Sequence, residues 1–218
     1  MAAPMQSGSR RSSAPFILLL FALIAGAPAL AQPNATAPAA QPPAFPQRAV
    51  LYVEDRSHPT GYQYSGSVVW RIEPLVDQPG QSVVHADIDI PDRQLTVTMR
   101  LYRNLDPTLA AGHIVALTFV APPEFGGGGI GEVRGLLVKP DPDTRGTPLL
   151  GASQKIAEGV FHLNLSDVDA ERERNLQLIK EGAWFSLAIV LADQHRAILA
   201  FEKGAPGGQV VERAVAAW

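Results

Sequence analysis

His85, Asp87 and Asp89 form the cluster whose residue types and spacing best suit metal chemistry in this chain. They alternate with apolar residues, and side chains two positions apart on a strand share one face, about 6.5 Å from each other. A histidine and two carboxylates could bind zinc or another divalent ion if a fourth group closed the site. His162 or Asn164 could supply that group from another strand. A solvated sheet face that carries charges without binding anything explains the same pattern, and both interpretations stand.

Other segments with a chemical motif lack the context that the chemistry needs. Gly126–Gly131 contains the pattern G-x-G-x-x-G, but no strand leads into it and a strand-like segment follows, so we expect a flexible loop and no nucleotide. Asp141–Gly146 resembles the start of a calcium loop, but Arg145 stands at a ligand position, which favours a plain turn. The chain has no cysteine and no G-x-S-x-G motif. We assign no catalytic residue and no cofactor, and the sequence favours a non-enzymatic protein while leaving activity open.

The N-terminal segment has the features of a secretory signal peptide. Arg10-Arg11 precedes the apolar run Phe16–Ile24. Ala29-Leu30-Ala31 has small residues at the two positions where a signal peptidase cleavage site requires them. The apolar run is shorter than the roughly 20 residues of a membrane-spanning helix. We expect residues 1–31 to be removed and the protein to work in the periplasm or outside the cell. The membrane would then be a partner only transiently, through the signal peptide.

Composition and charge restrict the partners and the domain organisation. The chain carries a net charge of −3, which becomes −5 when the two signal-peptide arginines are removed, so nucleic acid and nucleotides are not expected to bind. Because there is no disulfide, a packed core must stabilise the fold. Residues 32–47 are rich in proline and alanine and predict a linker. Residues 48–203 fit one domain, and residues 204–218 predict a flexible C-terminal tail.

Alternation of apolar and polar residues predicts strands along most of the domain. Val84–Ile90 and Leu95–Leu101 alternate regularly, and the short break Pro91-Asp92-Arg93 between them predicts a hairpin. Further segments are rich in β-branched and aromatic residues. These are residues 49–53, 64–72, 114–120, 133–139, 153–157, 160–165, 184–191 and 196–201.

One amphipathic helix is predicted near residues 167–181. Ser166 can cap its start, Lys180 suits its last turn, and Gly182 can end it. Because strands and helices do not alternate along the chain, a parallel α/β sheet is disfavoured. The sequence therefore predicts a mainly β fold, an antiparallel β-sandwich with this single helix.

Two segments carry a resemblance to other proteins. Gly66–Arg71, together with Arg174–Glu181 followed by Trp184-Phe185, resembles a group of uncharacterised exported or membrane-tethered bacterial proteins. The resemblance covers residues 48–203 and rests on structural rather than chemical motifs. It implies a place in the bacterial envelope and no particular activity.

These observations predict an exported, non-enzymatic β-sandwich that binds an envelope protein or another extracytoplasmic ligand. Its sheet edges and the loops Ala121–Gly131 and Pro140–Gly151 are the expected contact surfaces, because loops on a rigid scaffold commonly carry binding. Tyr62 and Tyr64, beside a turn, could form a sugar- or peptide-binding edge. Two other classes stay open: a metal-dependent hydrolase using the His85 cluster, and a small outer-membrane β-barrel.

Overall fold

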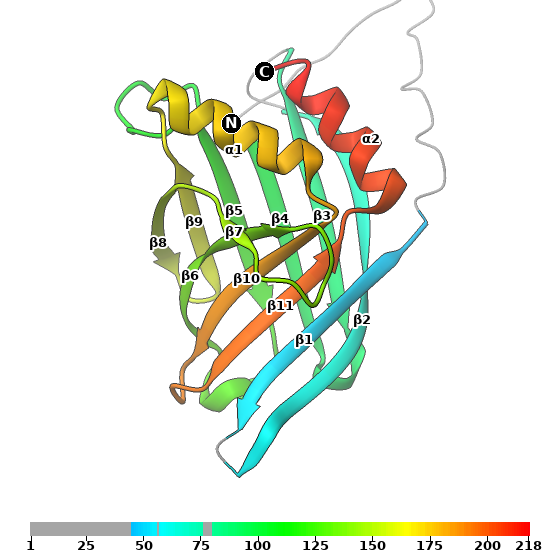
Figure 1. The fold of residues 1–218 in the computed structure, drawn as a ribbon. Coiled ribbons are helices and arrows are strands. Elements are labelled where there is room, and N and C mark those ends of the chain that lie inside the picture. The colour runs from blue at the N-terminus through cyan, green and yellow to red at the C-terminus, as the bar shows by residue number, and fades with distance from the viewer. Residues whose placement is uncertain (1–44, 56, 76–79) are drawn as a thin grey trace, which may run out of the picture. The chain divides into compact units, whose positions relative to one another are not determined.

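The computed structural model describes residues 45–55, 57–75 and 80–218. The expected signal peptide at residues 1–31, and the linker as far as residue 44, lie outside the described residues. In the described part of the chain, eleven strands form one antiparallel sheet that curls into a half-barrel (Figure 1). The strands are β1 (Gln47–Asp55), β2 (His58–Pro74), β3 (Ser82–Ile90), β4 (Leu95–Arg103), β5 (His113–Val120), β6 (Ile130–Lys139), β7 (Thr147–Pro148), β8 (Gly151–Ala157), β9 (Val160–Leu165), β10 (Trp184–Leu191) and β11 (Arg196–Glu202).

The prediction of a mainly β, antiparallel chain is confirmed, but the two-sheet sandwich is not. The strand order is β7-β6-β10-β11-β1-β2-β3-β4-β5-β9-β8. β1 pairs with both β2 and β11, so the two halves of the chain join into one sheet instead of forming two stacked layers. Alternation shows that a strand has one buried face, but it does not tell whether a second sheet or the curl of the same sheet covers that face.

The predicted hairpin is confirmed by the strand pairing of β3 and β4, and two further hairpins are present. β3 and β4 are joined by a short 3-10 helix at Pro91–Arg93, and β8 and β9 are joined at Glu158-Gly159. β10 and β11 are joined by a turn at residues 192–195. Gly159 has a φ of 69°, a conformation that glycine adopts without steric cost.

The core fills the inner, concave side of the curled sheet. Trp70 on β2 belongs to it, and its ring centroid lies 5.7 Å from that of Phe185 on β10 and 6.0 Å from that of Phe201 on β11. In the sheet order β2 is separated from β11 by β1, and from β10 by β1 and β11. Large aromatic side chains that meet across the curl therefore bury area that a flat sheet would leave exposed.

The predicted helix is present as α1 (Asp169–Glu181). Its last turn contains Lys180 and it ends at Gly182, where a Cβ atom would overlap the side chain of Val138. The predicted cap at Ser166 is wrong by two residues, because Val168 occupies the N-cap position. The Ser166 hydroxyl instead accepts a hydrogen bond from the Val168 amide, at 3.3 Å.

The prediction of a flexible tail at residues 204–218 is wrong, because Gly204–Val215 form a second helix, α2. Val211 and Ala214 are buried in the core, and Gly207 packs against Trp70 so closely that a Cβ atom would lie 2.9 Å from the indole. The glycines therefore allow close approach to the core instead of marking a break. Neither α1 nor α2, in the described ranges, is long and apolar enough to cross a membrane.

Candidate functional site

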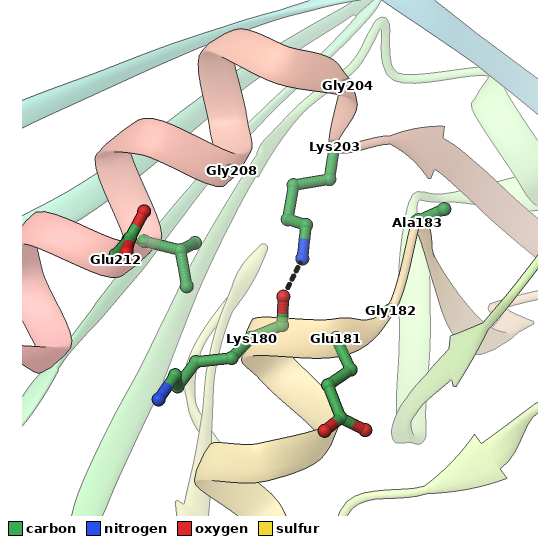
Figure 2. Close-up of a pocket in the computed structure, with 9 residues that line it drawn as sticks. Lys180, Glu181, Gly182, Ala183, Lys203, Gly204, Gly208 and Glu212 are labelled. Atoms are coloured by element: carbon green, nitrogen blue, oxygen red, sulfur yellow. Dashed lines mark hydrogen bonds between the residues drawn. The ribbon is translucent and has the colours of Figure 1, made fainter.

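A cleft of about 510 Å³ lies between the end of α1 and the start of α2 (Figure 2). The buried Lys203 points across it, and its Nζ donates hydrogen bonds to the main-chain oxygens of Ile179 at 3.1 Å and Lys180 at 2.6 Å. Burial lowers the pKa of Lys203. Because the last carbonyls of a helix lack partners within it, this ammonium caps α1. The position of Lys203 in the cleft is therefore explained by helix capping.

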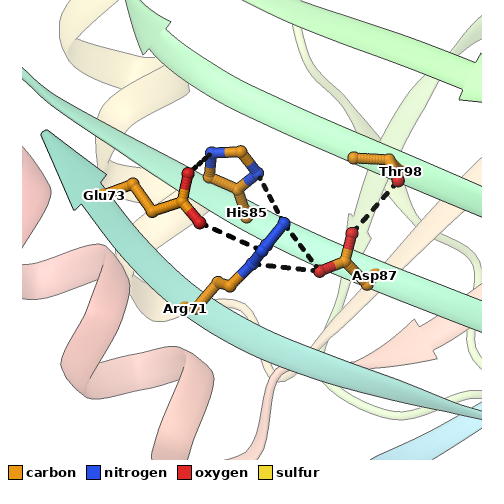
Figure 3. A network of polar contacts seen from close by, with 5 residues as sticks. All are labelled: Arg71, Glu73, His85, Asp87 and Thr98. Atoms are coloured by element: carbon orange, nitrogen blue, oxygen red, sulfur yellow. Dashed lines mark hydrogen bonds and ion pairs between the residues drawn. The ribbon is translucent and has the colours of Figure 1, made fainter. Parts of the chain in front are cut away.

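The predicted metal cluster lies on the outer face of β3, beside an arginine of the neighbouring strand (Figure 3). Arg71 stands opposite His85 in the β2–β3 pairing. Its Nη2 lies 3.0 Å from Oδ2 of Asp87, and its Nη1 donates to Oε1 of Glu73 at 3.1 Å. Asp87 also accepts a hydrogen bond from the Thr98 hydroxyl on β4 at 3.1 Å. The guanidinium therefore joins charged groups of two strands.

The contacts of His85 identify its protonation state. Its Nδ1 lies 3.3 Å from Nη2 of Arg71, which can only donate, so Nδ1 accepts. Its Nε2 then carries the proton and donates to Oε2 of Glu73, 3.1 Å away. Burial lowers the pKa of His85, and Arg71 and Arg100 lower it further, while Glu73 and Asp87 oppose them. His85 is thus a neutral imidazole with both nitrogens satisfied.

The proposed additional metal ligands lie on a distant strand. His85 pairs with Arg100, Arg100 with Ala116, and Ala116 with His162, so His162 lies three strands away, or about 14 Å. Asn164 is two residues further along the same strand β9. Among the described residues, no group of three or more His, Asp or Glu side chains is arranged to hold a metal ion. The geometry instead gives His85 and Asp87 a structural role around Arg71, and the metal site stays a prediction.

The glycine-rich loop packs against the turn between β10 and β11. The main-chain oxygens of Gly126 and Gly129 accept hydrogen bonds from the amides of Asp193 at 2.9 Å and Ala192 at 3.0 Å. A Cβ atom on Gly127 would lie 2.8 Å from Asp193. Close packing explains the glycines, and the loop holds the turn in place.

The Asp141–Gly146 segment begins with the expected turn. Oδ1 of Asp141 accepts hydrogen bonds from the amides of Asp143 and Thr144, both at 3.0 Å. An aspartate that caps the main chain two and three residues ahead is typical turn chemistry.

Tyr62 and Tyr64 belong to a row of stacked side chains on the β1–β2 hairpin. Ring centroids are 5.0 Å apart for His58 and Tyr62, and 6.4 Å apart for Tyr62 and Tyr64. The Arg93 guanidinium lies 4.9 Å from the Tyr64 ring. Tyr62 and Tyr64 are stacked while His58 is tilted against Tyr62, so these rings contact one another on the hairpin.

The sheet ends at β7, with the rest of β6, on one side and at β8 on the other, and we call the line along which these two ends approach each other the seam. Residues 147–157 run from one end of the sheet to the other. β7 pairs with β6 at Leu137 and Val138, and β8, which follows it, pairs with β9. The Leu149 amide adds a hydrogen bond to the Leu136 oxygen at 2.9 Å. The seam is therefore closed at the β7 end.

A buried asparagine of α1 holds the seam at the point where the chain changes edges. Oδ1 of Asn175 accepts from the Leu150 amide, and its Nδ2 donates to the Leu150 oxygen, both at 2.8 Å. The carboxamide takes the place of a neighbouring strand's main chain. Sequence reasoning missed this residue, because an asparagine in a charged helix looks solvent-facing until its partner is known.

Beyond this point β8 is exposed along its whole length. All seven of its residues are exposed, including Ser153 and Lys155, which pair with the buried Leu163 and Phe161 and share their inner face. A crevice of about 380 Å³ lies beside it. Its lining includes residues 134–137 of β6, residues 151–153 of β8, and the side chains of Leu149, Leu163 and Leu165. We call β8 and this crevice the open edge.

Comparison with known proteins adds no assignment. No protein-family model, no curated protein and no solved structure matches the chain. The resemblance to exported bacterial proteins therefore stays a prediction, and the function must be argued from the geometry.

Proposed function

We propose that this chain is an exported, non-enzymatic binding or accessory protein of the bacterial cell envelope, working in the periplasm or outside the cell. Its partner is an envelope protein or another extracytoplasmic ligand. The open edge supports this proposal most directly: in the described part of the chain, β8 pairs on one side only and is exposed on both faces. A strand held in this way contributes little buried area to its own fold, so its retention is best explained by a partner.

The open edge also has features that prevent indiscriminate pairing. An exposed edge with free amides and carbonyls invites aggregation, and natural sheets protect such edges with lysines and irregular strands. β8 has Lys155, paired with Glu158 at 2.9 Å, and its register shifts between Lys155 and Ala157. These features favour one specific partner over self-assembly.

Site-specific photo-cross-linking in living cells tests the proposal. A photoreactive amino acid at Ile156 on β8 is compared with one at Ile198 on β11, since these residues are similarly exposed, at 48% and 42%. Ile198 lies on a strand paired on both sides, so it is a matched control. We expect a discrete cross-linked product from Ile156 and none from Ile198. Equal labelling at both positions, or a product confined to the cytoplasmic fraction, would refute the proposal.

A further inference from the structure

We infer that the partner supplies an extended polypeptide segment, which adds a strand beside β8 and inserts an aliphatic side chain into the crevice. This inference rests on the proposed function and names the chemistry of its partner. It follows from two observations about the open edge, one concerning the main chain and one concerning the lining of the crevice.

The main chain of β8 favours a polypeptide over a glycan or a lipid. β8 pairs with β9 from Gly151 to Ala157, and no other described strand pairs with it. At its start β8 faces β6 across the crevice, and beyond that point its far side presents main-chain amides and carbonyls to an added strand. Only another extended main chain has donors and acceptors at this repeat, which is the basis of recognition by strand addition.

The crevice sets the side-chain preference of the added strand. Leu149, Leu163 and Leu165, which are buried and aliphatic, line it, and the small side chain of Ser153 lies beside them. An aliphatic side chain fits this lining, whereas a charged one would be desolvated without a partner. The ammonium of Lys155 already pairs with Glu158, so the added strand needs no acidic residue opposite it.

Linear peptides displayed on phage and selected on the full chain provide the probe. We expect the selected peptides to have aliphatic residues at alternating positions, and the bound peptide to slow amide hydrogen exchange in residues 151–157. Ser153→Trp, which fills the crevice, should weaken binding by about tenfold or more. Ser153→Phe, which fills the same inner-face position with a smaller ring, should act in the same way. Thr118→Trp, an exposed strand position on β5, should bind like the unaltered protein.

Several results would overturn the inference. One is that no peptide is selected, and another is that the bound peptide slows amide hydrogen exchange in residues 121–131 instead of in β8. A third is that both crevice variants, shown by circular dichroism to be folded, bind the peptide as well as the unaltered protein does. The cross-linking experiment separates this inference from the proposed function. A glycan or lipid captured at Ile156 would leave the proposed function intact and refute the added strand. A product of twice the chain's mass would assign the edge to two copies of this chain and refute it as well.

Discussion

Acidification should weaken the fold through His113, a buried residue of β5 that is only 4% exposed. Its Nε2 has no hydrogen-bond partner among the described residues, and its ring centroid lies 4.9 Å from that of Trp218. Burial lowers the pKa of His113 to about 4, and the charges of Arg103 and Arg172 act in the same direction. The folded protein therefore keeps this imidazole neutral where an unfolded chain would protonate it.

The size of the effect follows from the two pKa values. As the pH falls below 6.5, the ordinary value, the unfolded chain binds a proton that the folded chain does not, so the free energy of unfolding decreases. The loss is complete once the pH has passed the folded-state value of about 4. At about 1.4 kcal/mol per pH unit, the full loss is about 3 kcal/mol, of which about 2 kcal/mol is reached by roughly pH 5.

Urea unfolding followed by tryptophan fluorescence, between neutral pH and about pH 5, measures this loss. His85 and His162 also have lowered pKa values, so the unaltered protein should lose more than His113 alone explains. In His113→Leu the loss should shrink by about 2 kcal/mol, because the titrating group is removed. Phe119→Leu, a buried change on the same strand, should lower stability equally at every pH. Identical pH dependence in His113→Leu and the unaltered protein would refute the reasoning.

Three further predictions concern the seam, the helix cap and the metal hypothesis. Asn175→Leu should lower the free energy of unfolding by about 1–3 kcal/mol, measured by urea titration, because the Leu150 amide loses its partner while the Leu150 oxygen keeps only the Ser166 amide; a loss below about 0.5 kcal/mol would show that the seam needs no clamp. Lys203→Met keeps the aliphatic stem but removes the cap, and should cost about 1–3 kcal/mol in thermal unfolding; an unchanged midpoint would contradict the capping role. Elemental analysis of the purified protein should find no stoichiometric zinc or manganese, since Arg71 contacts His85; bound metal that disappears in His85→Ala would restore the metal site.

Local patterns predicted the strands well, because alternation depends only on neighbouring residues. The β3–β4 hairpin, for example, follows from two alternating runs and one short break. The curl of the sheet could not be predicted in this way, since it depends on β1 pairing with both β2 and β11. β7, with two residues, is too short to leave a pattern at all.

The remaining differences arise where packing overrides local preference. Glycine and proline at residues 204–208 normally interrupt a helix, yet α2 forms there because Gly207 fits against Trp70. Within the candidate metal cluster, the sequence correctly placed His85 and Asp87 on one face. It could not show that Arg71 from the next strand lies between them. The open edge could not be predicted from the sequence for the same reason. Whether a strand lies at the edge of a sheet depends on which strands pair with it.

The position of β1 constrains the order in which this protein can fold. Val50 pairs with Ser65 on one side and with Ala200 on the other, so one side of β1 pairs with a strand far along the chain. Closing such a long loop is entropically costly, and topologies rich in distant pairings fold slowly. A chain that emerges N-terminus first from a ribosome or a translocation channel therefore exposes one side of β1 until β11 has followed. During that interval the unpaired side of β1 is open to pairing with the wrong strand.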